Sequence, residues 1–80
     1  MELKWKKHAN YLEREIKFDS QKELASFLLK IAEQSDKVKH HCDMEIYKAT
    51  TLKLRLTTHD AKNTITDKDY NLAKWIDSIK

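Results

Sequence analysis

The sequence contains neither glycine nor proline among its 80 residues. A loop that cradles a nucleotide phosphate needs glycine, because glycine lets backbone amides approach the phosphate closely. The dinucleotide fingerprint and the P-loop are therefore excluded, and nucleotide-dependent chemistry is not expected. Without glycine, we expect any turn with a positive φ angle to use Asn or Asp. The available residues of these types include Asn10, Asp36, Asp43, Asn63 and Asp67.

Cysteine and long apolar runs are equally scarce. Cys42 is the single cysteine, which excludes an internal disulfide framework and a zinc site built from several cysteines. The longest apolar runs are about three residues, whereas a membrane-spanning helix needs about 18. The N-terminus has no apolar stretch of signal-peptide length. We therefore expect a cytoplasmic protein in a reducing compartment, with no membrane partner.

Charge of one sign is also lacking. Lys and Arg number 16 against 13 Asp and Glu, so the net charge is only +3 although 36% of the residues are charged. The strand face that carries Lys53 and Arg55 also carries Glu13, Glu15 and Glu45. These acids offset the basic residues, so the sequence shows no one-signed groove for a phosphate backbone. Nucleic acid is therefore not favoured as a partner.

Hydrophobic residues make up 40% of the chain, which is enough for a compact core. A chain of 80 residues supports one core and not two. We therefore expect a single domain over residues 1–80.

Alternation of apolar and polar residues predicts four strands. Residues 11–18 place apolar side chains on one face, interrupted by Arg14, and residues 3–7 can pair with them through a short loop. A second pair of strands is expected as another hairpin after residue 42. The apolar residues of this second pair are Met44, Ile46, Leu52, Leu54 and Leu56.

Two helices are predicted by apolar stripes at three- and four-residue spacing. The first is expected at about residues 20–35, where Ser20 and Glu23 form a capping box. The second follows Thr66, with acids in its first turn. The order strand, strand, helix, strand, strand, helix predicts an α+β fold. We expect one four-stranded antiparallel sheet with both helices on one face.

Three of the four histidines lie at expected strand ends. His40 and His41 come just before the third strand, and His59 follows the fourth. By strand parity, His59 shares a face with Lys53 and Arg55 and should project away from the helices. The outer ends of two hairpin strands lie side by side. We therefore expect a cluster of three histidines on the open face of the sheet.

A cluster of imidazoles suits general acid and base catalysis, because the unperturbed pKa of histidine is about 6.5. Two other interpretations stay open on the residues alone. Each histidine can be a solvated loop residue, or His40, His41, Asp43 and His59 can supply N and O ligands to a metal. Adjacent residues on an extended strand point to opposite sides, which makes His40 and His41 a poor chelating pair.

Several motifs occur together in the second half of the chain. The run DKVKHHC at residues 36–42 is followed by LKLRLTTHDAKNTITDKDYNLAKWIDSIK. An acid four residues before a histidine pair, a Thr-His on the last strand and a Thr-x-x-Asp helix start resemble the pterin-4a-carbinolamine dehydratases. The resemblance extends from about Trp5 to the C-terminus.

The resemblance implies the activity of a 4a-hydroxytetrahydrobiopterin dehydratase, a hydro-lyase of pterin recycling. Such an enzyme dehydrates 4a-hydroxytetrahydropterin to quinonoid dihydropterin with no metal or organic cofactor. His40 and His59 are then the candidates for acid and base, in either order, and His41 is expected to hold the pterin. The resemblance also implies a set of substrate-binding residues. These are Asp36, Asp43, Thr58 and Asp69.

Two of these acids carry specific expectations. Asp36 matches the family's acid before the histidine pair, where it can orient and charge-stabilise an imidazole. Asp69 matches the acid after the last strand, although an acid in the first turn of a helix is stabilising by itself.

The resemblance also implies self-association, because the family assembles dimers and tetramers. A homodimer or homotetramer would cover the exposed edges of a four-stranded sheet and enlarge a marginal core. The rival function is non-catalytic. It is a binding module for protein or nucleic acid, or a dimerisation cofactor for another protein, which is a second role of some relatives. Trp5 and Trp75 are interpreted as packing residues.

Overall fold

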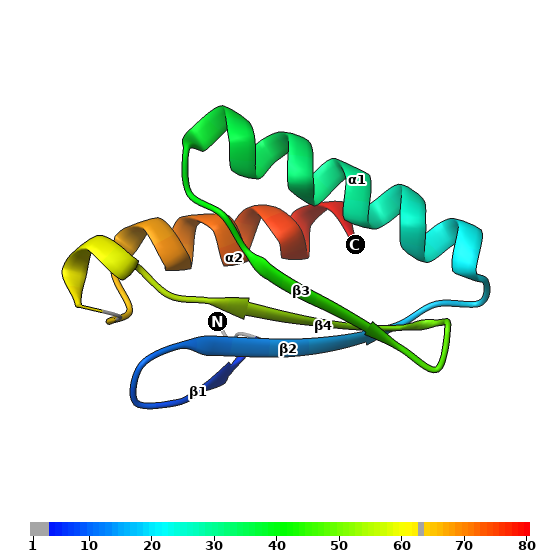
Figure 1. Ribbon diagram of the computed structural model, residues 1–80, viewed down its shortest axis with the longest axis horizontal. Coiled ribbons are helices and arrows are strands. Elements are labelled where there is room, and N and C mark those ends of the chain that lie inside the picture. The colour runs from blue at the N-terminus through cyan, green and yellow to red at the C-terminus, as the bar shows by residue number, and fades with distance from the viewer. Residues whose placement is uncertain (1–3, 63) are drawn as a thin grey trace.

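The computed structural model describes residues 4–62 and 64–80. Its elements follow the predicted order ββαββα, with one added turn of 3-10 helix (Figure 1). They are β1 (Lys6–Lys7), β2 (Leu12–Lys17), α1 (Gln21–Val38), β3 (Asp43–Tyr47), β4 (Thr51–Leu56), the 3-10 helix η1 (His59–Ala61) and α2 (Asp67–Ile79). The first strand was expected from residue 3, which lies outside the described residues.

The strands form one antiparallel sheet in the order β1-β2-β4-β3. Both helices lie on the same side of this sheet, and the other side is open (Figure 1). The β3–β4 register is continuous from Asp43 opposite Arg55 to Tyr47 opposite Thr51. The predicted fold class is therefore confirmed: an α+β fold with a four-stranded antiparallel sheet and two helices on one face.

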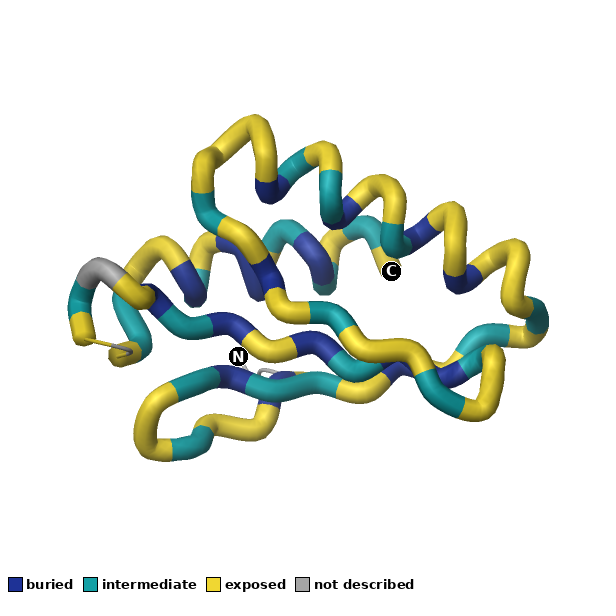
Figure 2. The backbone as a smooth tube through the Cα atoms, in the orientation of Figure 1, coloured by how far each residue is buried: buried dark blue, intermediate teal, exposed yellow. Residues whose placement is uncertain are grey.

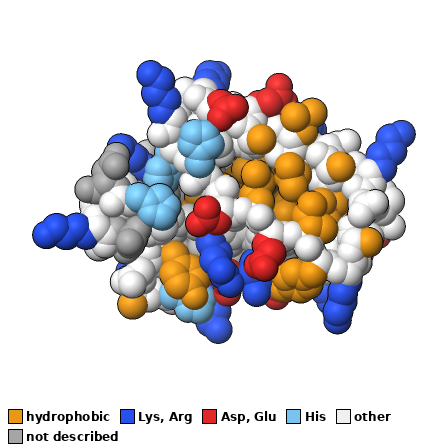
Figure 3. Space-filling view, in the orientation of Figure 1, with side chains coloured by type: hydrophobic (Ala, Val, Ile, Leu, Met, Phe, Trp, Pro, Cys, Tyr) orange, Lys and Arg blue, Asp and Glu red, His pale blue; other side chains and the backbone are white. Residues whose placement is uncertain are grey.

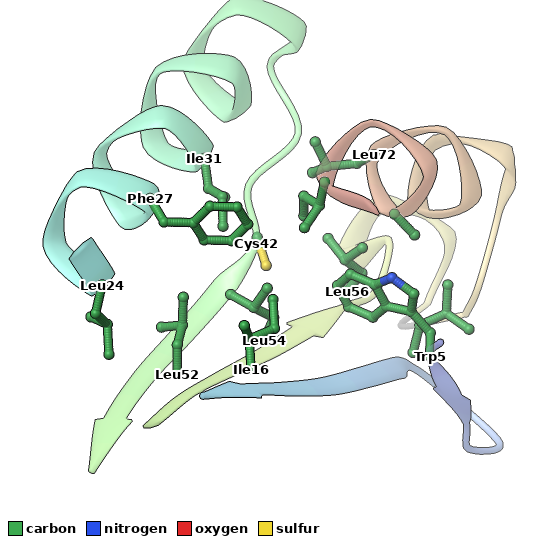
Figure 4. Close-up of a cluster of buried hydrophobic side chains, with 13 residues drawn as sticks. Trp5, Ile16, Leu24, Phe27, Ile31, Cys42, Leu52, Leu54, Leu56 and Leu72 are labelled. Carbon is green, nitrogen blue, oxygen red and sulfur yellow. The ribbon is translucent and has the colours of Figure 1, made fainter. Parts of the chain in front are cut away.

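The core lies between the sheet and the helices. Leu52, Leu54 and Leu56 of β4 are fully buried, and the residues between them are more exposed, as Figure 2 shows for this central strand. In Figure 4, Phe27 and Ile31 of α1 point toward this layer of leucines. Period-two alternation is what a sheet with one buried face requires, and it explains why the strands could be predicted.

Charged side chains on the open face neutralise one another across strands. Glu13 of β2 lies opposite Arg55 of β4, and Arg55 Nε donates a hydrogen bond to Glu13 Oε2 at 2.8 Å. This hydrogen bond lowers the pKa of the Glu13 carboxyl below its ordinary value. Glu15 similarly lies opposite Lys53. The sequence predicted that acids balance the basic residues on this face, and the structure shows that they do so in pairs across neighbouring strands.

Helix α1 begins at the predicted cap and ends one turn later than predicted. Ser20 Oγ accepts a hydrogen bond from the Glu23 backbone N–H at 3.1 Å. The helix continues past residue 35 to Val38, because no residue of that turn breaks it, and Lys39 then ends it. Asp36 consequently lies on the helix and not in a loop. Neither helix of the described chain is long and apolar enough to cross a membrane.

Four described residues adopt positive φ angles, and none of them is Asn or Asp. They are Lys39, Lys48, Ala49 and Lys62, with φ between 55° and 65°. The expectation that such turns use Asn or Asp is therefore wrong for the described residues, and the candidate Asn63 lies outside them. Chain geometry decided these positions. Lys39 and Lys62 end helices, where each backbone N–H is bonded to a carbonyl of the preceding turn.

Replacement of Ala49 by Gly is expected to stabilise the fold by about 1 kcal/mol. A left-handed conformation costs a residue with a Cβ atom roughly 1–2 kcal/mol, and glycine removes this cost. Glycine also increases the conformational entropy of the unfolded chain, which cancels part of the stabilisation. The measurement is urea unfolding at equilibrium. Ala25→Gly provides the matched control, because Ala25 is exposed within α1 and the change there should destabilise by about 1 kcal/mol. If both substitutions changed the free energy of unfolding in the same direction, the argument from the left-handed backbone at Ala49 would be contradicted.

Arg14 interrupts the apolar face of β2, and the structure shows how its charge is accommodated. Its guanidinium forms an ion pair with Asp77 of α2, and only 9% of the Arg14 side chain is exposed. Trp5 Nε1 donates a hydrogen bond to the same carboxylate at 2.9 Å. Trp5 is itself buried, as its interpretation as a packing residue requires. Two donors on one carboxylate tie the N-terminal strands to the end of α2.

Candidate active site

A cavity of about 200 Å³ lies where β4 leaves the sheet and the chain enters β3. His40, His41 and His59 all line it. Figure 3 shows histidine surface, in pale blue, at the end of the molecule that carries η1 and the start of α2. The other residues lining this histidine pocket are Lys39, Asp43, Thr57, Thr58 and Lys68. The structure therefore brings together the three histidines that the sequence separates.

His40 is held by a buried carboxylate. Its Nε2 lies 2.6 Å from Asp69 Oδ1, and its side chain is 11% exposed whereas that of Asp69 is fully buried. Helix α2 supplies Asp69 from its first turn, and the left-handed residue Lys39 turns the chain back toward α2. His40 and Asp69 are 29 residues apart in the sequence, and the fold brings them into contact.

Asp69 has more than one partner, and these fix its role as an acceptor. Its Oδ2 accepts hydrogen bonds from Thr58 Oγ1 at 2.8 Å and from the Thr66 backbone N–H at 2.9 Å. An ionised carboxylate only accepts hydrogen bonds, so the short contact to His40 requires a proton on Nε2. This tautomer leaves Nδ1 of the neutral imidazole as the nitrogen with a lone pair. Asp69 is therefore both a helix cap and the partner of His40.

His41 has a different environment from its neighbour. Its Nε2 lies 2.7 Å from Asp36 Oδ1, and both side chains are mostly exposed, at 68% and 77%. The extra turn of α1 brings Asp36 to this position. The predicted match between Asp36 and an imidazole therefore holds for His41. Exposed ion pairs are weak, so this contact orients His41 loosely.

Thr58 and His59 approach the pocket from the end of β4. Thr58 is buried, and besides its bond to Asp69 its Oγ1 lies 2.7 Å from Thr66 Oγ1. His59 is exposed and begins η1. Asp43 is exposed at the start of β3 and lines the same cavity. All seven predicted site residues therefore lie in or directly around one cavity.

The histidine cluster does not lie on the open face of the sheet as expected. His40 faces the helix layer, because its partner Asp69 belongs to α2. His59 stands in a 3-10 turn, where the strand parity used to place it no longer applies. The cluster instead lies at the end of the sheet beside the first turn of α2, which contributes Lys68 to the lining.

Metal binding finds no support in the geometry of the described chain. His40 and His41 have separate carboxylate partners, Asp69 and Asp36. No three His, Cys, Asp or Glu residues among those described are placed to hold a metal ion together. Cys42 lies in the core behind the site, and burial raises the pKa of its thiol to about 12. A thiol that stays protonated at neutral pH is a poor metal ligand and a poor nucleophile.

Sequence reasoning missed part of the cavity lining. Lys39, Thr57 and Lys68 line the histidine pocket but were not predicted. Thr66 was predicted as a helix cap and also contacts Thr58. Lys68 precedes Asp69 in the first turn of α2, and that adjacency was the only signal for it in the sequence.

Comparison with known proteins shows the family to which the chain belongs. Residues 1–79 match the family model described as pterin 4 alpha carbinolamine dehydratase. A protein of Sulfurisphaera tokodaii named "Putative pterin-4-alpha-carbinolamine dehydratase" is 40% identical over 94% of this chain and 78% of its own. One of the same name from Acidobacterium capsulatum is 33% identical over 94% of this chain and 79% of its own. The chain belongs to the pterin-4a-carbinolamine dehydratase family.

Solved structures share the fold. A transcriptional coactivator/pterin dehydratase from Brucella melitensis superposes with a TM-score of 0.86 at 23% identity, over 95% of this chain and 81% of that one. A pterin dehydratase-like protein described as a RuBisCO assembly factor in the alpha-carboxysome gives a TM-score of 0.73 at 15% identity. That match covers 98% of this chain and 88% of the other. At these identities the likeness establishes the fold alone.

Proposed function

We propose that this protein is a cytoplasmic 4a-hydroxytetrahydropterin dehydratase of pterin recycling that uses histidine acid and base catalysis. The observation that carries the proposal is the His40–Asp69 pair beside His41 and His59 in one cavity. A buried carboxylate that fixes the tautomer of a pocket histidine is the arrangement that proton transfer needs. Family membership supplies the substrate class.

The reaction needs two proton movements and no redox step. The C4a–O bond breaks with its electron pair on the oxygen, which takes a proton and leaves as water. N5 gives up its proton, and its lone pair forms the N5=C4a double bond of the quinonoid dihydropterin. A protonated imidazole at the hydroxyl and a neutral imidazole at N5 suffice for these steps.

His40 and His59 are assigned to the two proton transfers, in an order that kinetics must decide. The Nε2 proton of His40 is engaged by Asp69, so its Nδ1 is the nitrogen for exchange with substrate. His41 is assigned to holding the pterin, because it is exposed and only loosely oriented by Asp36. Asp43 and Thr58 complete the wall on which the ring would rest.

The test is acceleration of dehydration of chemically generated 4a-hydroxytetrahydropterin, followed through formation of the quinonoid product. His40→Ala and His59→Ala are each expected to lower the catalysed rate by about 10²–10⁴-fold. His8→Ala is the matched control, because His8 stacks on Tyr11 in the loop between β1 and β2 and does not line the pocket. Circular dichroism checks that each variant is folded.

The same assay decides between catalysis and the rival binding role. A well-folded wild-type protein that neither accelerates dehydration nor binds pterin would overturn the enzymatic proposal. It would leave the non-catalytic binding module, or a dimerisation cofactor, as the function of this fold.

Self-association accompanies the proposal. Strand β3 pairs on one side only, and Ile46 on it is 46% exposed. An apolar side chain on an unpaired edge strand favours association with a second copy. A homodimer or homotetramer is therefore expected in light scattering at micromolar concentration. A monomer under those conditions would contradict this part of the proposal.

A further inference from the structure

Thr58 lines the histidine pocket, yet its hydroxyl is directed to partners within the protein. Thr58 is 5% exposed, and its Oγ1 lies 2.8 Å from Asp69 Oδ2 and 2.7 Å from Thr66 Oγ1. A hydroxyl has one proton to donate, and an ionised carboxylate can only accept. The Thr58 proton is therefore engaged by Asp69 and is not free to bind a ligand.

The contact between the two threonines then has a fixed direction. Because the Thr58 proton is bonded to Asp69, the Thr66 hydroxyl must be the donor to Thr58 Oγ1. Hydrogen bonds in a chain polarise one another, so the bond from Thr66 strengthens the bond that Thr58 donates. Thr66, Thr58 and Asp69 thus form a hydroxyl chain that ends at His40, whose Nε2 lies 2.6 Å from Asp69 Oδ1.

The hydroxyl chain acts on the charge of Asp69. The Asp69 side chain is fully buried, so hydrogen bonds from the protein take the place of water around its carboxylate. The donors on Oδ2 draw negative charge away from Oδ1, which is the oxygen that faces His40. A carboxylate that loses a donor binds a proton more tightly. The Thr58 hydroxyl therefore weakens the hold of Asp69 on the proton that it shares with His40.

We propose that Thr58 is a positioning residue of the dehydration, whose hydroxyl sets the pH at which the His40–Asp69 pair gives up its proton. Thr66 supports it from the outer end of the hydroxyl chain. The inference rests on the proposed dehydratase function. It gives Thr58 a role that differs from the substrate contact implied by the family resemblance.

Other titratable groups surround the His40–Asp69 pair, and the test must leave them unchanged. Asp36 contacts His41, and the Cys42 thiol stays protonated in the core. Threonine and valine are both uncharged and similar in shape, so Thr58→Val alters none of these charges. A shift in the titration of His40 therefore reports the lost hydrogen bond. The remaining titratable groups line the histidine pocket and are Lys39, His41, Asp43, His59 and Lys68.

The first measurement is a pH titration of the His40 ring by nitrogen-15 NMR in the substrate-free protein. Thr58→Val is expected to move the midpoint to higher pH by about one unit, and Thr58→Ser should restore the wild-type midpoint. Thr66→Val should move it in the same direction by less. Circular dichroism checks folding, and Thr66→Val, at a half-buried position, carries the test if Thr58→Val does not fold.

Thr51→Val is the matched control for this titration. Thr51 is also buried, at 7% exposure, but it begins β4 at the opposite end of the strand and does not line the pocket. The same removal of a hydroxyl there should leave both the His40 midpoint and the dehydration rate unchanged.

The second measurement is the pH dependence of kcat/KM for dehydration. If His40 is the base, its neutral form is required, and Thr58→Val should move the acidic limb of the profile up by about one pH unit. If His40 is the acid, its protonated form is required, and the alkaline limb should move up instead. The limb that moves therefore also decides the order of the two proton transfers.

Two results would overturn the inference. One is an unchanged His40 midpoint in folded Thr58→Val, and the other is a shifted midpoint that Thr58→Ser does not restore. A wild-type protein that does not accelerate dehydration would overturn the proposed function instead. The substrate-free titration would still decide whether Thr58 acts on the His40–Asp69 pair.

Discussion

Asp69→Asn is expected to lower the catalysed dehydration rate by about 10²–10⁴-fold while the protein stays folded. The Thr66 backbone N–H can only donate, so the amide oxygen of the new Asn must face it. The amide NH₂ group then faces His40 and needs an acceptor there. Nε2 of His40 must become that acceptor, which moves the ring proton to Nδ1. The nitrogen assigned to proton exchange is then blocked in the neutral ring.

The readout that separates this effect from a structural one is the tautomer of His40. Nitrogen-15 chemical shifts of its ring should change from the Nε2–H to the Nδ1–H pattern in the variant. Asp67→Asn is the matched control, because it makes the same chemical change in the same turn of α2 but at an exposed position. It should leave both the rate and the His40 spectrum unchanged. An unaltered tautomer with a reduced rate would contradict the positioning role of Asp69.

Leu54→Ala is expected to destabilise the protein by about 3–5 kcal/mol. Leu54 is fully buried at the centre of β4, between β2 and β3 and beneath the helices. Truncation there removes transfer free energy and leaves a cavity that the neighbouring strands cannot fill. The total free energy of unfolding for a domain of this size is about 4–12 kcal/mol, so the loss is a large part of it.

Urea unfolding, monitored by circular dichroism, measures this loss. Leu29→Ala is the matched control, because Leu29 is 59% exposed on α1 and the same truncation should change stability by less than about 0.5 kcal/mol. Comparable losses in both variants would show that the core is not where the burial pattern places it. Because self-association adds stability, both variants must be compared at one protein concentration.

In the proposed mechanism, the His40–Asp69 pair is the centre of proton transfer. Asp69 caps α2 and satisfies Thr58 and Thr66 at the same time. A carboxylate that is needed for the helix start is therefore also fully buried and fixed in position. The proposed function therefore couples stability and catalysis at one residue, which is why the conservative change to Asn is more informative than removal of the side chain.

The order of elements and the fold class followed from the sequence because their signals are local. The alternation of apolar and polar residues in 12–16 and 52–56 indicates which side of each strand is buried, and it can be recognised without knowing which strands pair. The Ser20 and Thr66 caps mark helix starts for the same reason. The expected juxtaposition of His40, His41 and His59 was also correct, because a hairpin brings its strand ends together.

Two local rules failed where chain geometry determined the conformation. The end of α1 was placed too early, because the apolar stripe stops before the helix does. Positive φ angles fell on lysine and alanine, since helix ends and a hairpin set the dihedral angles whatever residue stands there. Neither error changes the fold, but the first moved Asp36 onto the helix beside His41.

The sequence by itself determined the ββαββα order, the amphipathic faces and the residue types of the site. The tertiary structure alone decided that His40 faces α2 and pairs with Asp69, that Arg14 is neutralised by Asp77, and that a cleft lies between the helices. The physical reason is the range of the interactions. Periodicity and capping act over a few residues. The contact between His40 and Asp69 spans 29 positions and that between Arg14 and Asp77 spans 63, and both exist only once the helices pack on the sheet.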